Sequence, residues 1–280
     1  MKLTQTYVDK VINTALAEDI NYIDVTTDNL IGAEHKSSAY YVAKDDGVLC
    51  GIDIAKRVFE LAGDGVSFQK LMCDGDKVRK GDIIAKMSGS TATLLKGERT
   101  ALNILQHLSG IATTTNKCAE LVKGTKASVT DTRKTLPGLR AMQKYAVTVG
   151  GGKNHRFNLS DGAMLKDNHI DAYGGITAAV TALREKIGHM VKIEVEVRNL
   201  DELREALDNR CEVIMLDNMS CEEMKKAVEI TDGKALLEAS GNVTAENIRS
   251  VAETGIDIIS LGALTHSVRC FDISMKIEKQ

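Results

Sequence analysis

Charged, hydroxyl and glycine residues follow a series of short apolar runs in the second half of the chain. In order, the runs deliver Arg133-Lys134, Lys166, Glu196, Asp217, Ser240-Gly241 and Gly262-Ala263. One such residue alone would usually be a solvated loop residue, but six in succession are hard to explain in that way. The carboxyl ends of the strands in a β/α barrel converge on the active site. The pattern therefore predicts a catalytic pocket built from these residues.

The segment from Thr132 to His169 is strongly basic. It contains seven Lys or Arg against two Asp, a net charge of +5, whereas the whole chain carries −3. Guanidinium forks and lysine ammonium groups match carboxylates and phosphates. A solvated basic face is the alternative, but these charges fall between apolar runs and not on a repeated helix face. We therefore expect a small polyanionic substrate.

Two glycine-containing turns follow the last two apolar runs, at 238–242 (EASGN) and 260–265 (SLGALT). Each turn precedes an expected helix start. Backbone N–H groups at such places bind phosphate, and barrels commonly hold phosphate after their late strands. Either turn alone could be an ordinary connection, but the pair favours a phosphorylated ligand.

A third glycine run, Gly150-Gly151-Gly152-Lys153, does not complete a nucleotide-binding P-loop, because Asn154 follows the lysine. We expect it to be a flexible turn that brings the next two residues, His155 and Arg156, into the pocket.

Glu196 and Asp217 place two carboxylates after neighbouring runs. Such a pair can hold Mg²⁺ or ribose hydroxyls, or stabilise a cationic sugar. A general acid–base pair is also possible, and the residues themselves do not distinguish these roles.

The elements that must position these side chains alternate regularly. Apolar runs begin near Ala127, Gly162, Lys192, Val213, Ala235 and Ile256, and helix-like stretches such as LDELREALDN lie between them. The last three runs are about 21 residues apart, the length of one β-α unit. Alternation of strand and helix gives a parallel sheet. Six units instead of eight predict an incomplete or irregular barrel.

The first 105 or so residues follow a different pattern. An amphipathic helix is expected at the N-terminus, and short strands with Asp-Gly and Lys-Gly turns predict a hairpin-rich sheet up to Met87. Apolar residues then recur at helical spacing from Leu94 to about Val122, so we expect one long helix leading into a second domain.

Bulk properties narrow the class of protein. The chain is slightly acidic, so its net charge does not attract nucleic acid. With 4% aromatic residues and no Trp, it also has few side chains on which bases could stack. Its six scattered cysteines form no C-x-x-C pair, and no long apolar run or secretory leader is evident. We expect a cytoplasmic enzyme that binds neither nucleic acid nor membrane.

Longer motifs resemble the quinolinate phosphoribosyltransferases, also called carboxylating nicotinate-nucleotide pyrophosphorylases. The most specific block comprises DTRKTLPGLR at 131–140, KYAVTVGGGKNHR at 144–156 and LKDNHI at 165–170. Shorter matches are ALAED, DVTT, GERTALN, IEVEV, LDNM and LGALTHS. Order and spacing are preserved from near residue 15 to near residue 275.

The resemblance implies an α/β fold with an N-terminal open α/β sandwich and an irregular, incomplete β/α barrel. The expected sandwich comprises residues 1–105, joined by the C-terminal tail 268–280, and the expected barrel comprises residues 106–267. It further implies a homodimer in which each subunit contributes Arg99 to the active site of its partner.

By resemblance, residues at the matching motif positions are also expected to form the quinolinate site of the family. Arg133, His155 and Arg156 would hold the two carboxylates of quinolinate, together with Arg99 from the other subunit.

The phosphoribosyl half of the site carries over in the same way. Lys134 and Lys166 would neutralise phosphates, and Glu196 and Asp217 would face the ribose and the cofactor Mg²⁺. These four are the expected catalytic residues. The expected substrate contacts are Arg99, Thr132, Arg133, Lys134, His155, Arg156, Lys166, Glu196, Asp217, Ser240, Gly241, Asn242, Leu261, Gly262 and Ala263.

The activity that the resemblance implies joins quinolinate to phosphoribosyl pyrophosphate and decarboxylates it. The products would be nicotinate mononucleotide, pyrophosphate and CO₂, a step of NAD biosynthesis. Three alternatives stay open: a related phosphoribosyltransferase acting on another aromatic acid, a Schiff-base aldolase with Lys166 as nucleophile, and a non-catalytic nucleotide sensor.

Overall fold

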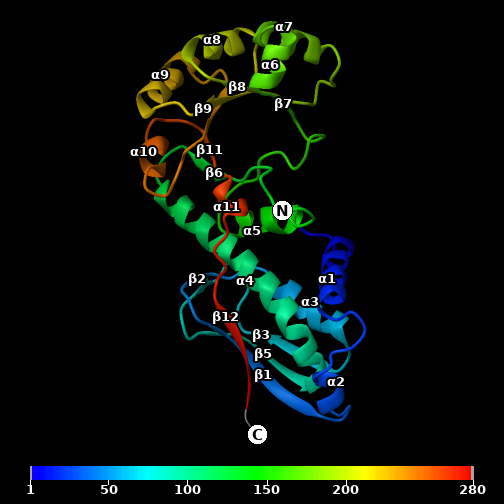
Figure 1. The fold of residues 1–280 in the computed structure, drawn as a ribbon. Helices are drawn as coiled ribbons and strands as arrows, with labels where there is room; N and C mark the ends of the chain where they lie inside the picture. Colours follow the sequence, from blue (N-terminus) through cyan, green and yellow to red (C-terminus); the bar gives the residue numbers. More distant parts are fainter. Residues whose placement is uncertain (1, 279–280) are drawn as a thin grey trace. The chain divides into compact units, whose positions relative to one another are not determined.

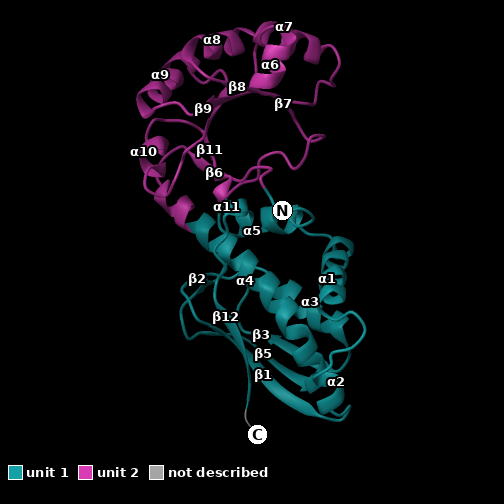
Figure 2. Cartoon of the chain, viewed as in Figure 1, with its two compact units in different colours: residues 1–116, 135–151, 264–280 teal, residues 117–134, 152–263 magenta. Residues whose placement is uncertain are grey.

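The computed structural model describes residues 2–278 and divides into two compact units. Unit 1 comprises Met1–Asn116, Thr135–Gly151 and Leu264–Gln280, and unit 2 comprises Lys117–Lys134 and Gly152–Ala263 (Figure 2). The sequence analysis assigned residues 106–116, 135–151 and 264–267 to the barrel, whereas they group with unit 1. One reason is that a single helix continues through residue 105 without a break.

Unit 1 contains an antiparallel sheet with the strand order β12-β1-β5-β3 (Figure 1). Its strands are β1 (Lys36–Ala43), β3 (Val66–Lys70), β5 (Ile83–Ser90) and β12 (Ile273–Ile277). The C-terminal strand therefore pairs with the first one, Tyr41 lying opposite Met275. Alternate residues of β1 are buried, as expected for a sheet with one covered face.

The prediction of a hairpin-rich sheet is wrong in its pairing. Among β1 to β5, no strand pairs with the strand that directly follows it in the sequence. Instead β1 pairs with β5, and the short strands β2 (Gly47–Val48) and β4 (Lys77–Val78) pair with each other. The Asp-Gly and Lys-Gly turns change the direction of the chain without joining paired strands.

One helix of unit 1, α3 (Ile52–Ala62), packs against this sheet. Phe59 of this helix lies 6.4 Å from Tyr41 and 5.9 Å from Phe68 between ring centroids, which fastens the helix to β1 and β3. The expected long helix is confirmed as α4, and the amphipathic N-terminal helix as α1. The helices are α1 (Gln5–Asp19), α2 (Thr27–Leu30), α3 (Ile52–Ala62), α4 (Thr91–Leu121), α5 (Arg140–Val149) and α11 (Ala263–His266).

The end of α5 lies against α4 at a position that only glycine can occupy. A Cβ atom on Gly150 would collide with the backbone oxygen of Ala112 and the side chain of Thr115. The glycine run is therefore a close packing contact, and Gly151 adopts a positive φ of 93° directly after it.

Unit 2 contains six parallel strands in the order β6-β11-β10-β9-β8-β7. All six expected strands are confirmed. They are β6 (Ser128–Thr130), β7 (Ala163–Leu165), β8 (Ile193–Val197), β9 (Val213–Asp217), β10 (Leu236–Ser240) and β11 (Ile258–Ser260). The first strand pairs with the last, while β6 and β7 form the two ends of the strand order. The sheet is therefore a six-stranded, incomplete barrel, as predicted.

The helices of unit 2 follow the strands as expected. Ser220 and Glu223 form a capping box at the start of α9, and the side chain of Asn199 caps α8. The helices are α6 (Asp167–Tyr173), α7 (Ile176–Arg184), α8 (Leu200–Asp208), α9 (Cys221–Thr231) and α10 (Ile248–Ala252). Among the described residues, no helix is both long and apolar enough to cross a membrane.

Candidate active site

A cavity of about 480 Å³ opens at the carboxyl ends of the parallel strands in unit 2. Ten of the expected site residues line it: Thr132, Arg133, Lys134, His155, Arg156, Lys166, Glu196, Asp217, Ser240 and Gly241. The residues at the ends of five separate strands therefore converge, as the sequence pattern predicted.

Five expected residues lie outside this lining. Asn242, Leu261 and Gly262 belong to the turns after β10 and β11, and Ala263 is the first residue of α11. Arg99 belongs to unit 1, where it is exposed on α4.

The sequence analysis missed a second layer of the cavity. Met164, Met215 and Glu238 line it two residues before Lys166, Asp217 and Ser240, respectively. Ser260 also lines the cavity, and Asn218 follows Asp217. Side chains two residues apart on a strand point to the same face, so this period could have revealed the deeper layer.

Asp131, directly after β6, holds in place the loop of residues 153–156, which we call the basic loop. Its fully buried carboxylate accepts hydrogen bonds from the backbone N–H of His155 at 2.9 Å and from Nδ2 of Asn154 at 2.6 Å. Beside it, the backbone of Lys153 donates to the carbonyl oxygen of Val129 at 2.8 Å. These bonds place residues 153–155 alongside the β6 strand.

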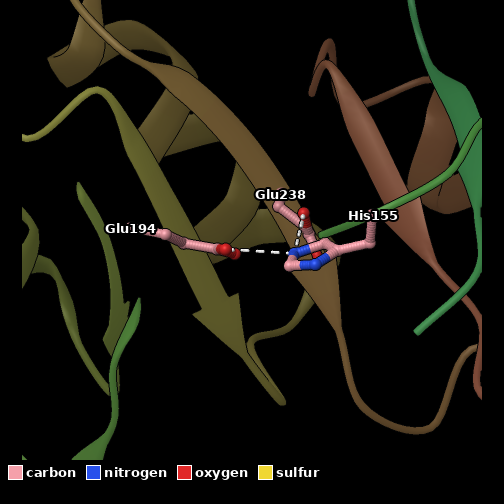
Figure 3. A group of neighbouring side chains, drawn as sticks. All are labelled: His155, Glu194 and Glu238. Carbon is pink, nitrogen blue, oxygen red and sulfur yellow. Dashed lines mark ion pairs between the residues drawn. The ribbon is translucent and has the colours of Figure 1, made fainter. Parts of the chain in front are cut away.

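The two ring nitrogens of His155 have different partners. The backbone N–H of Arg156 donates to Nδ1 at 2.8 Å, so Nδ1 carries the lone pair and the ring proton is on Nε2. The Nε2–H group lies 3.0 Å from Oε2 of Glu194 and 3.5 Å from Oε2 of Glu238 (Figure 3). His155 is thus a neutral hydrogen-bond donor to the buried acids in this arrangement.

Arg156 extends from the same loop into the cavity. One of its guanidinium nitrogens, Nη1, donates to the carbonyl oxygen of Gly162 at 2.8 Å. Burial lowers the pKa of Arg156, and the positive charge of Arg133 lowers it further, while Glu194 opposes the shift. Two partly desolvated cations that repel each other favour the binding of an anion.

Glu194 and Glu238 form a buried acid pair beneath His155. Their exposed fractions are 7% and 1%. Burial raises the pKa of Glu238 to about 7, and the negative charge of Glu194 adds to the increase, while His155 and Ser260 oppose it. Near neutral pH, Glu238 therefore exchanges between the acid and the carboxylate.

The group of His155, Glu194 and Glu238 has the spacing of a metal site, since its ligand atoms lie within 4.8 Å of one another. A metal on Nε2 would require the ring proton on Nδ1, where metal-bound histidines usually donate to an acceptor. Here Nδ1 faces a donor, the N–H of Arg156. The hydrogen bonds therefore favour a proton-binding cluster over a metal centre.

Lys166 and Glu196 form an ion pair across the strand ends, with Nζ 2.8 Å from Oε2. Asp217 accepts a hydrogen bond at 3.0 Å from Nδ2 of Asn218, and Asn242 donates in turn to Oδ1 of Asn218 at 3.0 Å. The carboxylates of Glu196 and Asp217 are the hard oxygen donors that suit Mg²⁺.

The two expected phosphate turns differ from each other. Gly241 has a positive φ of 90°, and a Cβ atom there would collide with the side chain of Asn218, so glycine is required. The turn precedes a helix, as expected, but this helix, α10, begins only at Ile248. Gly262, in contrast, directly precedes the short helix α11.

Comparison with known proteins identifies the family. The quinolinate phosphoribosyl transferase N-terminal domain matches residues 24–109, and the C-terminal domain of the same family matches residues 111–276. The chain belongs to the quinolinate phosphoribosyltransferase family. The family resemblance expected from the sequence motifs is thus confirmed.

Individual members of the quinolinate phosphoribosyltransferase family agree over nearly the whole chain. A probable carboxylating nicotinate-nucleotide pyrophosphorylase from Bacillus subtilis is 44% identical over 268 residues, which cover 96% of this chain and 92% of that protein. A chloroplastic relative from Arabidopsis thaliana is 41% identical, covering 96% and 82%. The structure of the nicotinate-nucleotide pyrophosphorylase from Francisella tularensis has a TM-score of 0.95 at 39% identity, covering 99% and 98%.

We predict that ¹⁵N NMR of the labelled protein at neutral pH will show an unprotonated Nδ1 and a protonated Nε2 for His155. The reason is that Nδ1 accepts the backbone N–H of Arg156, whereas Nε2 faces two carboxyls. The His155→Gln variant identifies the signals by their loss. A protonated Nδ1 would contradict the assigned tautomer and would favour a metal site at His155, Glu194 and Glu238.

Proposed function

We propose that this protein transfers the phosphoribosyl group of phosphoribosyl pyrophosphate to quinolinate and decarboxylates the product. It would thereby form nicotinate mononucleotide, pyrophosphate and CO₂ for NAD biosynthesis. One observation carries the proposal: in a chain of this family, two arginines, two lysines and two strand-end acids line a single cavity. Such a cavity can hold a dianionic ring beside a phosphorylated sugar.

Quinolinate binds at the arginine side of the cavity. Arg133 and Arg156 offer planar guanidinium groups that can each fork a carboxylate. Burial lowers the pKa of Arg156 and the charge of Arg133 lowers it further, and a bound dianion would offset both effects. Contact of His155 with a carboxylate stays a prediction, because its ring nitrogens already bond within the protein.

The phosphoribosyl half lies at the strand ends. Lys134 and Lys166 neutralise the pyrophosphate group, while Glu196 and Asp217 face the ribose hydroxyls. The 5′-phosphate binds at the turns after β10 and β11, which contain Ser240-Gly241, Asn242 and Leu261 to Ala263. The positive φ of Gly241 supports this placement, since it leaves backbone close to the cavity without a side chain.

Magnesium is part of the proposal. Glu196 and Asp217 fit it by their chemistry, because Mg²⁺ is usually held by one or two carboxylates together with substrate phosphates. When bound, Mg²⁺ would withdraw charge from the departing pyrophosphate.

The reaction then depends on positioning and charge. The pyridine nitrogen attacks C1 of the ribose as pyrophosphate leaves, and the carboxylates of Glu196 and Asp217 stabilise the cationic character of the sugar. Once its nitrogen carries the ribose, the ring is positively charged and can accept the electron pair left by CO₂. The arginines hold the ring in place during both steps.

The proposal includes a cytoplasmic homodimer in which Arg99 acts on the quinolinate of the partner's site. Its exposure on α4 supports this role, because the guanidinium group is accessible to another chain.

The aldolase alternative receives no support from the geometry. A Schiff-base lysine must lose its proton, which desolvation or a neighbouring cation promotes. Lys166 is instead about half exposed, and its Nζ is paired with the carboxylate of Glu196.

We expect the purified protein to release CO₂ from quinolinate labelled in its 2-carboxylate when phosphoribosyl pyrophosphate and Mg²⁺ are present. CO₂ and pyrophosphate should form in equal amounts, because each turnover yields one of each. Nicotinate is the control substrate, since it lacks the 2-carboxylate. Pyrophosphate release with another aromatic acid but not with quinolinate would instead identify a related transferase.

We predict that Arg133→Ala and Arg156→Ala each weaken quinolinate binding about 100-fold or more, because truncation leaves a carboxylate unpaired in the pocket at a cost of about 3 kcal/mol. Binding of phosphoribosyl pyrophosphate should change much less. Titration calorimetry of both ligands measures the difference. Arg204→Ala is the matched control, since Arg204 forms a surface pair with Asp201 on α8. Normal quinolinate binding by either pocket variant would refute the carboxylate assignment.

Arg99 is predicted to work in trans. A mixture of Arg99→Ala and Arg133→Ala subunits should form heterodimers with one intact site, because a two-fold contact is reciprocal. Two inactive proteins should then regain about half of the wild-type activity per heterodimer. Subunit exchange is verified by mass spectrometry of differently tagged chains. If exchange occurs and no activity returns, Arg99 does not act across the interface.

A further inference from the structure

The buried acid pair has no role in the steps described so far. Glu194 on β8 and Glu238 on β10 both point toward the same side of the His155 ring (Figure 3). Both Oε2 atoms lie near Nε2 of His155, whereas both Oε1 atoms are buried without a hydrogen-bond partner among the described residues. Buried polar groups of this kind are uncommon and call for an explanation. Glu238 also lines the substrate cavity.

The surroundings of this pair favour the retention of one proton. Two ionised carboxyls at such depth would repel each other, and burial disfavours each charge. His155 cannot accept the proton without losing the bond to the Arg156 N–H, since its other nitrogen is already protonated. The charged and polar groups that act on Glu238 are Glu194, His155, Ser260 and Lys166, from β8, the basic loop, β11 and the end of β7. Together they leave its pKa at about 7, so the acid form is available near neutral pH.

The decarboxylation requires a proton. When the bond between C2 of the ring and the carboxylate breaks, CO₂ leaves and the electron pair stays on C2. The product carries hydrogen at that carbon, so one proton must be delivered to C2 in every turnover. Pyrophosphate release and CO₂ loss do not supply it.

We propose that Glu238 is the general acid that delivers this proton to C2 of the ring. This inference rests on the proposed function. The C2 electron pair takes the proton of Glu238, and the electron pair of the O–H bond returns to the carboxylate. Glu194 and His155 act as positioning residues that hold this carboxyl and its proton at the base of the cavity. Water that enters after product release restores the proton.

Other residues of the cavity are less suited to this step. Nζ of Lys166 is paired with Glu196, and Asp217 accepts a bond from Asn218. Arginine does not release a proton under ordinary conditions. Glu238 is the group whose burial and neighbours keep it protonated near neutral pH while it still lines the cavity.

The test is Glu238→Gln, which preserves size and neutrality but removes the acidic proton. In rapid-quench single turnovers, pyrophosphate release and the KM for quinolinate should stay within about threefold of wild type. Formation of nicotinate mononucleotide should slow about 100-fold, in line with the usual contribution of a general acid. Glu229→Gln, an exposed acid on α9, is the matched control and should behave as wild type.

The pH profile provides a second readout, which a purely structural role would not produce. Because the acid form is required, kcat of the wild type should fall as pH rises through the ionisation of Glu238. Glu194→Gln removes the charge that raises the pKa of Glu238, so this decline should move to lower pH. In Glu238→Gln the decline should be absent. If Glu238→Gln fails to fold, the direction in which Glu194→Gln moves the pH of the decline in kcat still tests whether Glu238 is the acid.

Three results would overturn the inference. Glu238→Gln could form product within twofold of wild type, it could slow pyrophosphate release as much as product formation, or the pH decline could be unaffected in Glu194→Gln. A lysine donor would place the decline near pH 10. Inactivity of the wild type toward quinolinate would instead reject the proposed function, and so the two failures are distinguishable.

Discussion

The buried carboxylate of Asp131 fixes the geometry on which the rest of the site depends. It joins the end of β6 to the loop that carries His155 and Arg156, two residues that lie over twenty positions further along the chain. The long excursion between them includes α5, which belongs to unit 1. A short hydrogen bond to a fully buried anion is stronger than one between neutral groups. These hydrogen bonds therefore bring residues 154 and 155 back beside the end of β6 after the chain has passed through unit 1.

Basic and acidic side chains occupy different parts of the active site in unit 2. Lysines and arginines line the cavity, while two buried acids and a neutral imidazole lie next to it. The acids lower the cost of gathering cations in one place, and the cations attract anionic substrates. Since Arg156 and His155 are consecutive, a single backbone segment links the two parts.

Sequence patterns predicted the strand ends of the barrel well, because the local spacing of apolar residues and the turn-forming residues that follow them determine where a strand stops. They did not reveal Glu238, which lies mid-strand in an apolar run and resembles a solvent-facing residue. Its importance arises from β8, which places Glu194 nearby, and from a loop that places His155 there. The pairing of β1 with β5 was missed for a similar reason. Alternation along β10 could place Glu238 on the face of Ser240, but its contacts with Glu194 and His155, like the pairing of β1 with β5, join distant segments that no local pattern connects.

The pairing of β12 with β1 has a consequence for the order of events during synthesis. β1 is among the first strands to leave the ribosome, yet its outer neighbour, residues 273–277, is among the last. The edge of β1 must remain exposed, with unpaired backbone groups, while every strand of the barrel is made. Consecutive strands from β7 to β11 pair with each other, whereas the sheet of unit 1 is completed only by residues 273–277. The loss of residues 273–277 would thus leave unpaired the edge of a strand that was translated long before them.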